Sequence, residues 1–290
     1  METIYFSLPG NENLTRQLAQ KANAQVGLAD LMCFPDGESY VCVHSDVQNK
    51  CAVLVCTLNN PDLKILPIYF LSKTLRSLGA KKIILIAPYL AYMRQDKIFH
   101  SGEGLTSSYF ANLISELADE LITIDPHLHR IGTLSEIYSI PAVTRSASEL
   151  ITNYIKQNIK NPLLIGPDAE SEQWVSKIAA EAQASFIVLH KIRYGDRDVE
   201  VSMPDAKNYN EFTPVLVDDI ISTAKTMIRT IEHLNELKMK APVCIGIHAI
   251  FAGNAYRELQ MAGAADIITT TTVPHQSNQI DISNLLQLPA

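Results

Sequence analysis

The sequence lacks the features that mark a membrane-spanning, nucleic-acid-binding or secreted protein. Its longest apolar runs, such as residues 82–90, are much shorter than the roughly 18–20 residues that a bilayer-spanning helix needs. The 24 lysines and arginines are outnumbered by 31 acidic residues, and the net charge of −7 provides no global positive field for nucleic acid or an anionic membrane. The N-terminus has neither a basic region nor a long apolar one, so we expect no secretory signal.

Cysteine is scarce, and several common motifs are missing. The five cysteines form no C-x-x-C pair, and an odd count without a secretory signal indicates reduced thiols, packed in the core of a cytoplasmic protein. A G-x-G-x-x-G after a strand, a G-x-x-x-x-G-K-[ST] loop, H-E-x-x-H and G-x-S-x-G are all absent. These absences argue against a standard dinucleotide fold, a nucleotide-binding P-loop, structural zinc and a serine-hydrolase elbow.

The composition and the apolar pattern indicate an α/β protein of two domains. The chain has 290 residues, of which 47% are hydrophobic and 19% charged, and this length is near the limit for a single core. Short apolar runs, such as residues 52–56 and 82–87, alternate with amphipathic stretches such as residues 64–77 and 104–118. This alternation predicts mainly parallel sheets with helices on both faces.

The chain also resembles itself at a fixed offset. A shift of 162 residues places residues 52–55 on residues 214–217 and Ile83 on Ile245, which suggests two domains of the same fold. Only the second copy has acids and hydroxyls after its strand, where ligands bind in such sheets.

Residues 217–226 (VDDIISTAKT) form the most informative segment, predicted to run from a strand into a helix. Its paired acids can accept hydrogen bonds from two vicinal hydroxyls. The following STAKT supplies backbone N–H groups at a helix N-terminus, hydroxyls and an ammonium, which suit a phosphate. The alternative is a helix cap beside a solvated acidic turn.

Three other segments carry weaker signals. Residues 125–129 (DPHLH) can place an imidazole at a metal or a phosphate, or can end in a surface histidine. Residues 165–172 form an acid-rich turn that is either a ligand site or an N-cap. Residues 191–197 are basic with one glycine, and are either a lid that carries charge to a phosphoryl group or a solvated hairpin.

Together these segments resemble the ribose-phosphate pyrophosphokinase (phosphoribosyl pyrophosphate synthase) family over nearly the whole chain. Residues 88–96 (PYLAYMRQD) and 101–106 (SGEGLT) are similar to its PYxxYxRQD…S-x-E-x-[IL]-[ST] signature. Residues 34–38 (FPDGE) resemble its F-x-D-G-E segment, residues 125–127 its D-x-H, and residues 217–226 its phosphoribosyl-binding motif. The short chain is most similar to the archaeal-type branch or to a divergent bacterial one.

The resemblance implies two tandem phosphoribosyltransferase-type (type I) domains. Residues 1–143 would form the ATP side, and residues 144–290 the ribose 5-phosphate side, with a C-terminal segment that packs back on the first domain. The implied reaction is Mg²⁺-dependent transfer of the diphosphoryl group of ATP to the anomeric hydroxyl of ribose 5-phosphate, giving phosphoribosyl pyrophosphate and AMP. The implied protein is a homo-oligomer, dimer or higher, because the hairpin of residues 34–38 would come from a neighbouring subunit.

The resemblance also assigns roles to residues. The ATP-binding residues would be Phe34, Asp36, Glu38, Arg94, Gln95, Asp96 and His127. The metal would be held by His127 and Asp168. The ribose 5-phosphate site would comprise Asp218, Asp219, Ser222, Thr223, Ala224, Lys225 and Thr226. The catalytic cations would be Lys191 and Arg193, which would neutralise charge on the transferring group.

Two departures from the family pattern keep an alternative open. Many members have Asp where Ser222 stands and Gly where Lys225 stands. These changes allow a catalytically weak or inactive regulatory relative that assembles with an active synthase. A phosphoribosyltransferase is a third possibility, but it predicts one such domain and a base-binding hood rather than a duplicated chain.

Overall fold

The computed structural model describes residues 1–288 except for 167–171, 189, 195–197, 203–208 and 210. The chain divides into two compact units. Unit 1 comprises Met1–Ser146 together with residues 283–288, and unit 2 comprises Ala147–Ile282. The family resemblance implies a boundary after residue 143. The C-terminal segment is tied to unit 1 by Lys21, whose ammonium donates to the hydroxyl of Ser283 at 2.7 Å and also to the amide oxygen of Asn284.

Unit 1 is built on a parallel sheet with the strand order β2-β1-β5-β6-β7-β8. The strands are β1 (Thr3–Ser7), β2 (Gln25–Val26), β5 (Cys51–Val55), β6 (Lys82–Ala87), β7 (Glu120–Ile124) and β8 (Ala142–Arg145). All five residues of β5 are buried, because a central parallel strand is covered on both faces. The predicted strand at residues 82–87 is confirmed.

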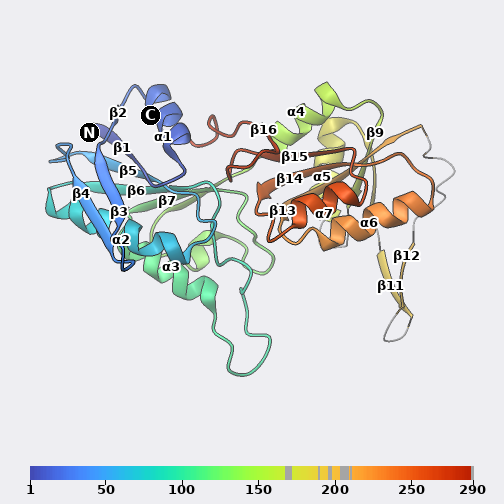
Figure 1. Cartoon of the computed structure of the whole chain (residues 1–290), viewed down its shortest axis with the longest axis horizontal. Coiled ribbons are helices and arrows are strands. Elements are labelled where there is room, and N and C mark those ends of the chain that lie inside the picture. The colour runs from blue at the N-terminus through green and yellow to red at the C-terminus, as the bar shows by residue number, and fades with distance from the viewer. Residues whose placement is uncertain (167–171, 189, 195–197, 203–208, 210, 289–290) are drawn as a thin grey trace. The chain divides into compact units, whose positions relative to one another are not determined.

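Three helices cover this sheet: α1 (Glu12–Lys21), α2 (Asp62–Ser77) and α3 (Thr106–Leu117). Figure 1 shows α1 on one side of the sheet and α2 and α3 on the other, as right-handed crossovers in opposite directions along the sheet require. Each helix buries one face; in α3 the buried face includes Phe110, Ile114 and Leu117. Among the described helices of the chain, none has the length and apolar character needed to cross a membrane.

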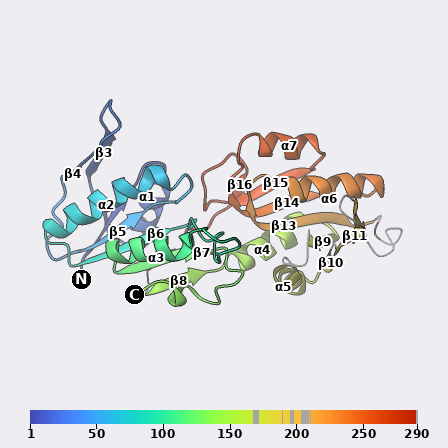
Figure 2. The same ribbon diagram turned by 90° about the horizontal axis from the view of Figure 1, so that it is seen from below.

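A two-stranded antiparallel hairpin projects from unit 1 (Figure 2). It consists of β3 (Ala29–Cys33) and β4 (Ser39–Val43). The alternating pattern of residues 39–44 predicts a strand there, which β4 confirms. The sequence gives no such signal for β3 (ADLMC), because it is mostly exposed and its apolar residues do not alternate cleanly.

Unit 2 repeats the architecture in the strand order β10-β9-β13-β14-β15-β16, again parallel. Its strands are β9 (Pro162–Gly166), β10 (Ser185–Val188), β13 (Thr213–Ile221), β14 (Val243–Ala249), β15 (Asp266–Thr270) and β16 (Asn278–Ile280). Its helices are α4 (Ser148–Asn158), α5 (Glu172–Ala182), α6 (Lys225–Glu236) and α7 (Ala255–Met261). β13 occupies the place in its sheet that β5 occupies in unit 1, so the predicted duplication of the fold is confirmed.

The basic segment that the sequence identifies as a lid or a hairpin is built around an antiparallel ladder. It consists of β11 (His190–Tyr194) and β12 (Asp198–Ser202). Lys191 pairs with Val201, and Arg193 pairs with Val199.

The cysteines are all free, but the prediction that they pack in the core is wrong for two of them. Cys51, Cys56 and Cys244 are buried strand or strand-end residues. Cys33 is exposed and Cys42 partly exposed, because both lie on the projecting β3–β4 hairpin rather than in a sheet covered by helices.

Candidate functional site

The end of β13 and the start of α6 form the phosphate-loop candidate of unit 2. The sequence predicts a strand over residues 214–218, with the paired acids at its end. Instead, β13 continues to Ile221, because its ladder with β14 extends to the pair Ile221–Ala249. Asp218 and Asp219 therefore lie inside the strand, both partly exposed, and the backbone N–H of Asp219 donates to Oδ1 of Asp218 at 3.0 Å.

The turn between this strand and α6 is held by neighbouring backbone. The N–H of Phe251 donates to the carbonyl of Ile221 at 2.9 Å, and the N–H of Ala252 donates to the carbonyl of Ser222 at 3.0 Å. Ala224 has a left-handed backbone with φ of 54°, which turns the chain directly into the first turn of α6. Gly246 supports the same turn, because a Cβ there would lie 2.5 Å from the side chain of Ile221.

This geometry suits an anion. The first backbone N–H groups of α6, from Lys225 onward, have no partner within the helix and carry the positive end of its dipole. Lys225 is exposed and Thr226 partly buried, while Ser222 and Thr223 precede the helix with their hydroxyls. No acidic residue lies in the first turn of α6. The segment therefore combines the backbone N–H groups of a first helical turn, hydroxyls and a cation, which is the donor set that a phosphate monoester requires.

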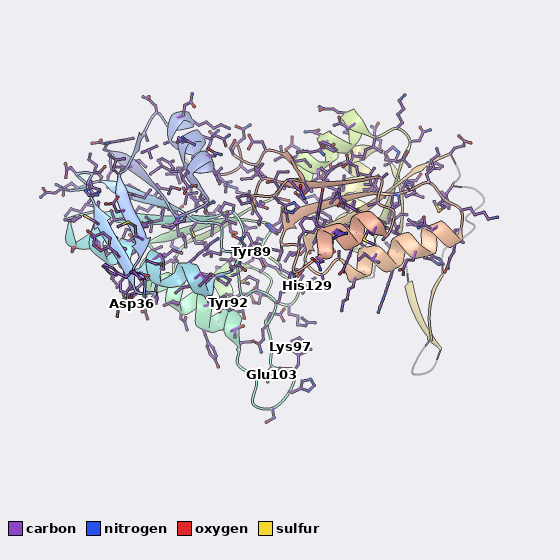
Figure 3. All side chains as sticks on the ribbon, viewed as in Figure 1. Asp36, Tyr89, Tyr92, Lys97, Glu103 and His129 are labelled. Carbon is purple, nitrogen blue, oxygen red and sulfur yellow. The ribbon has the colours of Figure 1, made fainter. Side chains whose placement is uncertain are left out.

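In unit 1, the loop after β6 is tied to the start of α3 through Gln95. The hydroxyl of Thr106 donates to the side-chain oxygen of Gln95 at 3.0 Å, and the N–H of Ser107 donates to its carbonyl at 3.4 Å. Arg94, directly before it, is exposed. Figure 3 shows Lys97 and Glu103 on the long loop that projects beyond this point. The carboxylate of Glu103 accepts N–H bonds from Phe99 and His100, which closes the loop on itself.

Asp96 forms an ion pair with Arg130 in the loop that follows β7. Nη1 of Arg130 lies 3.0 Å from Oδ1 and 3.3 Å from Oδ2 of Asp96, whose side chain is only 2% exposed. The guanidinium of Arg130 also lies over the ring of Phe99, 5.3 Å from its centroid. Two predicted ligand segments, residues 94–96 and 125–129, are thus joined by a residue that sequence reasoning missed. The only signal for Arg130 was its position directly after DPHLH.

The loop between β6 and α3, residues 88–105, is called the donor loop below. A cavity of about 390 Å³ lies beside it in unit 1. It is lined by α2 and α3 and by Tyr92, whose hydroxyl bonds to the carboxylate of Asp62 and whose ring packs on Phe110 at a centroid distance of 4.7 Å. That hydrogen bond to Asp62 raises the pKa of Tyr92. Tyr92 has a positive φ of 62°, so the PYLAYMRQD segment turns sharply just before its Arg-Gln-Asp.

His127, a predicted metal ligand, lies in the loop after β7. Asp125 has a φ of 35° and its N–H donates to the carbonyl of Arg145 at 2.9 Å, which fixes the start of the loop. The rings of His127 and His129 meet edge to face at 3.9 Å. Mg²⁺ prefers oxygen ligands and keeps several waters. The imidazole of His127, two residues after the partly buried Asp125, therefore fits an ion held chiefly by substrate phosphates and water.

The β3–β4 hairpin carries three of the predicted ATP-binding residues, Phe34, Asp36 and Glu38, at its tip. The N–H of Phe34 donates to the carbonyl of Glu38 at 2.7 Å, and Asp36 caps the turn by accepting the N–H of Glu38 at 3.2 Å. The side chain of Phe34 is 50% exposed. Figure 3 shows Asp36 well apart from Lys97 and the donor loop of the same chain. The structure therefore does not bring the hairpin tip to residues 94–96 of its own unit.

Asp168 is not among the described residues, and for Lys191 and Arg193 only the backbone ladder of β11 and β12 is described.

Comparison with known proteins identifies relatives of both units. Residues 3–117 match a family model described as the N-terminal domain of ribose phosphate pyrophosphokinase. Residues 133–283 match the phosphoribosyl transferase domain.

Curated relatives match almost end to end. A ribose-phosphate pyrophosphokinase of Saccharolobus solfataricus is 31% identical and covers 88% of this chain and 89% of its own length. Ribose-phosphate pyrophosphokinase 2 of Archaeoglobus fulgidus is 31% identical, with 96% of each chain covered, and the Methanobrevibacter smithii enzyme is 28% identical, with 94% and 95% covered. The crystal structure of phosphoribosylpyrophosphate synthetase from Mycobacterium smegmatis shares the fold, with a TM-score of 0.87, 22% identity, and 99% and 96% of the two chains covered.

Proposed function

The chain belongs to the ribose-phosphate pyrophosphokinase family, and on that premise we propose that it converts ATP and ribose 5-phosphate to 5-phosphoribosyl 1-pyrophosphate and AMP. The observation that carries this proposal is the left-handed turn at Ala224, which leads residues 222–226 into an α6 first turn without acids, in a chain that its relatives match almost end to end. The free thiols and the small phosphorylated substrates suit a reducing cytoplasm.

The sugar phosphate binds to unit 2. Asp218 and Asp219 accept hydrogen bonds from the 2- and 3-hydroxyls of the ribose, since ionised carboxylates only accept. The 5-phosphate is bound by the hydroxyls of residues 222–226, by the N–H groups of the first turn of α6 and by the ammonium of Lys225. Each of these groups donates a hydrogen bond, and the phosphate dianion can only accept.

The nucleotide binds to unit 1. Arg94 holds phosphate oxygens, and its fork of N–H donors matches them in pairs. Gln95 and Asp96 are held by Thr106 and Arg130, so the donor loop is organised before the substrate arrives.

The adenine is recognised by a neighbouring copy of the chain. Phe34 stacks on the base while Asp36 and Glu38 accept from its amino group. The hairpin tip stands apart from the donor loop of its own unit, which supports an oligomer, dimer or higher, in which each ATP site is shared.

The chemical step is a displacement at the β-phosphorus of ATP. The anomeric oxygen of ribose 5-phosphate forms a bond to this phosphorus and gives up its proton to water. The bond to the oxygen that bridges to the α-phosphorus breaks, and AMP leaves with that oxygen. No side chain is needed as a strong base, because the anomeric hydroxyl is already more acidic than an ordinary alcohol.

Charge neutralisation is the main contribution of the protein. Lys191 and Arg193 on β11 stabilise the charge that develops on the transferring group. His127 and Asp168 hold Mg²⁺ directly or through water. When bound, Mg²⁺ neutralises the phosphate oxygens of ATP.

The direct test is AMP release from ATP and Mg²⁺, measured by chromatography with ribose 5-phosphate, with ribose, and with neither. We expect AMP only with the phosphorylated sugar. The variant Asp218→Asn/Asp219→Asn, purified in the same way, controls for a contaminating enzyme and should lose the activity. A folded protein that forms no AMP would instead be the regulatory relative.

A further inference from the structure

Three side chains on the β3–β4 hairpin form a Cys–His–Asp series outside the proposed substrate contacts. Sγ of Cys42 lies 3.9 Å from Nδ1 of His44, and Nε2 of His44 lies 2.8 Å from Oδ2 of Asp30. The side chains of His44 and Asp30 are 49% and 52% exposed. A cysteine, an imidazole and a carboxylate in this order are the parts of an activated thiol nucleophile.

The hairpin ladder itself brings these residues together. Side chains of a strand alternate between its faces, so Tyr40, Cys42 and His44 share one face. The antiparallel register places Asp30 directly opposite Cys42, and the N–H of His44 continues the ladder by donating to the carbonyl of Leu28 at 2.9 Å. The arrangement is therefore fixed by backbone pairing rather than by flexible surface contacts.

The hydrogen-bonding partners determine which imidazole nitrogen faces the sulfur as a base. The ionised carboxylate of Asp30 can only accept, so Nε2 of His44 carries the hydrogen. In the neutral ring Nδ1 is then the acceptor, and it faces the Cys42 thiol. Within the described part of the chain, the residue groups that could hold a metal ion include neither Cys42 nor His44.

We propose that Cys42, with His44 and Asp30, is a reactive-thiol site for hydroperoxides, and that its oxidation weakens nucleotide binding. The second half of this proposal rests on the proposed function. His44 acts on the sulfur directly, and Asp30 is a positioning residue that acts through His44.

The reaction with a hydroperoxide uses the proton that His44 receives. The thiol proton passes to Nδ1, the sulfur attacks one peroxide oxygen, an S–O bond forms and the O–O bond breaks. The leaving oxygen takes the proton back from His44 and departs as water or an alcohol. Cys42 becomes a sulfenic acid, oxidised by two electrons, and the peroxide is reduced by two. The oxygen that leaves a hydroperoxide needs a proton. Because the imidazole of His44 can return that proton, the site suits hydroperoxides.

Tyr40 connects this thiol to the adenine-binding tip. A hydrogen bond with Cys42 raises the pKa of Tyr40, and the Tyr40 ring meets Phe34 edge to face at a centroid distance of 5.8 Å. An oxidised sulfur changes the partner of the Tyr40 hydroxyl. The ring of Phe34, which stacks on adenine in the proposed function, then loses a fixed neighbour.

The other cysteines supply internal controls. Cys33 is exposed on the same hairpin, but it is one residue out of phase with Asp30 and Met32 and so faces the opposite side. Burial raises the pKa of Cys56 and of Cys244 to about 12, so these thiols stay protonated at neutral pH.

The first experiment compares Cys42 with Cys33 in one sample. The intact protein is treated with hydrogen peroxide in the presence of dimedone, which traps sulfenic acids, and each adduct is followed by peptide mass spectrometry. We expect adducts to form about tenfold faster at Cys42 than at Cys33, because the thiolate is the nucleophile and His44 can take the thiol proton of Cys42. His44→Gln should reduce the rate at Cys42 to that of Cys33.

Variants of Asp30 separate positioning from a general loss of structure. Asp30→Asn should slow adduct formation at Cys42, and Asp30→Glu should restore most of the rate, while the Cys33 rate stays unchanged in both. A hairpin that had simply unfolded would change both cysteines. Equal rates at Cys42 and Cys33 in the unaltered protein, or an unchanged Cys42 rate in His44→Gln, would overturn the site.

The second experiment tests the link to the nucleotide. In a Cys33→Ser background, peroxide should raise KM for ATP several-fold and leave KM for ribose 5-phosphate unchanged. The matched Cys33→Ser/Cys42→Ser variant should not respond. Oxidation of Cys42 without a change in KM for ATP would overturn the link while leaving the reactive site in place. The labelling rates need no enzyme activity, so they remain informative even if the proposed function fails.

Discussion

Arg130 binds the carboxylate of Asp96 through one guanidinium nitrogen, at 3.0 Å and 3.3 Å from its two oxygens. Asp96 is nearly buried, with 2% of its side chain exposed, while Arg130 is 42% exposed. The pair connects the loop after β6 with the loop after β7, and therefore joins the proposed phosphate contacts of Arg94 to the segment of His127. In the proposed ATP site, Asp96 would therefore have two roles, as a lining residue and as the anchor of Arg130.

Removing Arg130 alone should lower the free energy of unfolding more than removing Arg130 when Asp96 has already been replaced. Arg130→Gln leaves a buried carboxylate without its cation, and we expect about 1–3 kcal/mol of lost stability together with a higher KM for ATP. In an Asp96→Asn background the same change should cost much less. Denaturant unfolding of the two single variants and the double variant measures this coupling. Additive costs would show that the ion pair contributes nothing.

Lys225 should matter for the sugar phosphate and not for ATP. Lys225→Ala removes a cation from the first turn of α6, so KM for ribose 5-phosphate should rise several-fold at low salt and less at high salt, where charge is screened. Arg229→Ala is the matched control, because Arg229 is also exposed on α6, one turn further along. An equal effect of the two variants, or none for Lys225→Ala, would show that backbone and hydroxyl donors suffice.

The cations of β11 should act on the chemical step. Lys191→Ala and Arg193→Ala should each lower kcat by about 10²–10³-fold, because preorganised charges of this kind contribute mainly in the transition state. KM for ATP should change far less. Steady-state kinetics with each substrate varied measures the split. An unchanged kcat in both variants would remove this strand from the mechanism.

A shared ATP site predicts complementation between inactive variants. Asp36→Ala damages the hairpin tip, and Arg94→Ala damages the donor loop, so each alone should be nearly inactive. Mixing and reassembly should restore activity, because one intact site forms from two different copies. A mixture of Asp36→Ala with Glu38→Ala is the control and should stay inactive, since both changes lie in the same tip. Failure of the first mixture to recover activity would contradict the shared site.

The sequence predicts the parallel sheets well and misjudges features that depend on pairing partners. Buried apolar runs such as Cys51–Val55 and Lys82–Ala87 identify central strands from composition alone. The fixed offset of 162 residues does not align both strand pairs of the two units. Thirty-one residues separate Ala52 from its ladder partner Ile83, whereas 28 separate Val215 from Val243. Apolar strands match one another in several registers, so a pattern comparison can slip along them.

The candidate site shows the same limit. The motifs identify the candidate phosphate turn and the donor loop, but they do not show that Asp218 and Asp219 lie inside β13, because that depends on how far β14 runs alongside it. They also miss Arg130 and the Cys42–His44–Asp30 series, which are assembled by contacts between segments distant in the sequence or across a ladder.

The central claim is the transfer of a diphosphoryl group, and phosphorus NMR of the reaction mixture tests it most directly. With ATP, Mg²⁺ and ribose 5-phosphate, the account predicts AMP and a sugar that carries a diphosphate at C1, formed in equal amounts and without ADP. Formation of ADP with a singly phosphorylated C1, or release of AMP that does not depend on ribose 5-phosphate, would contradict it.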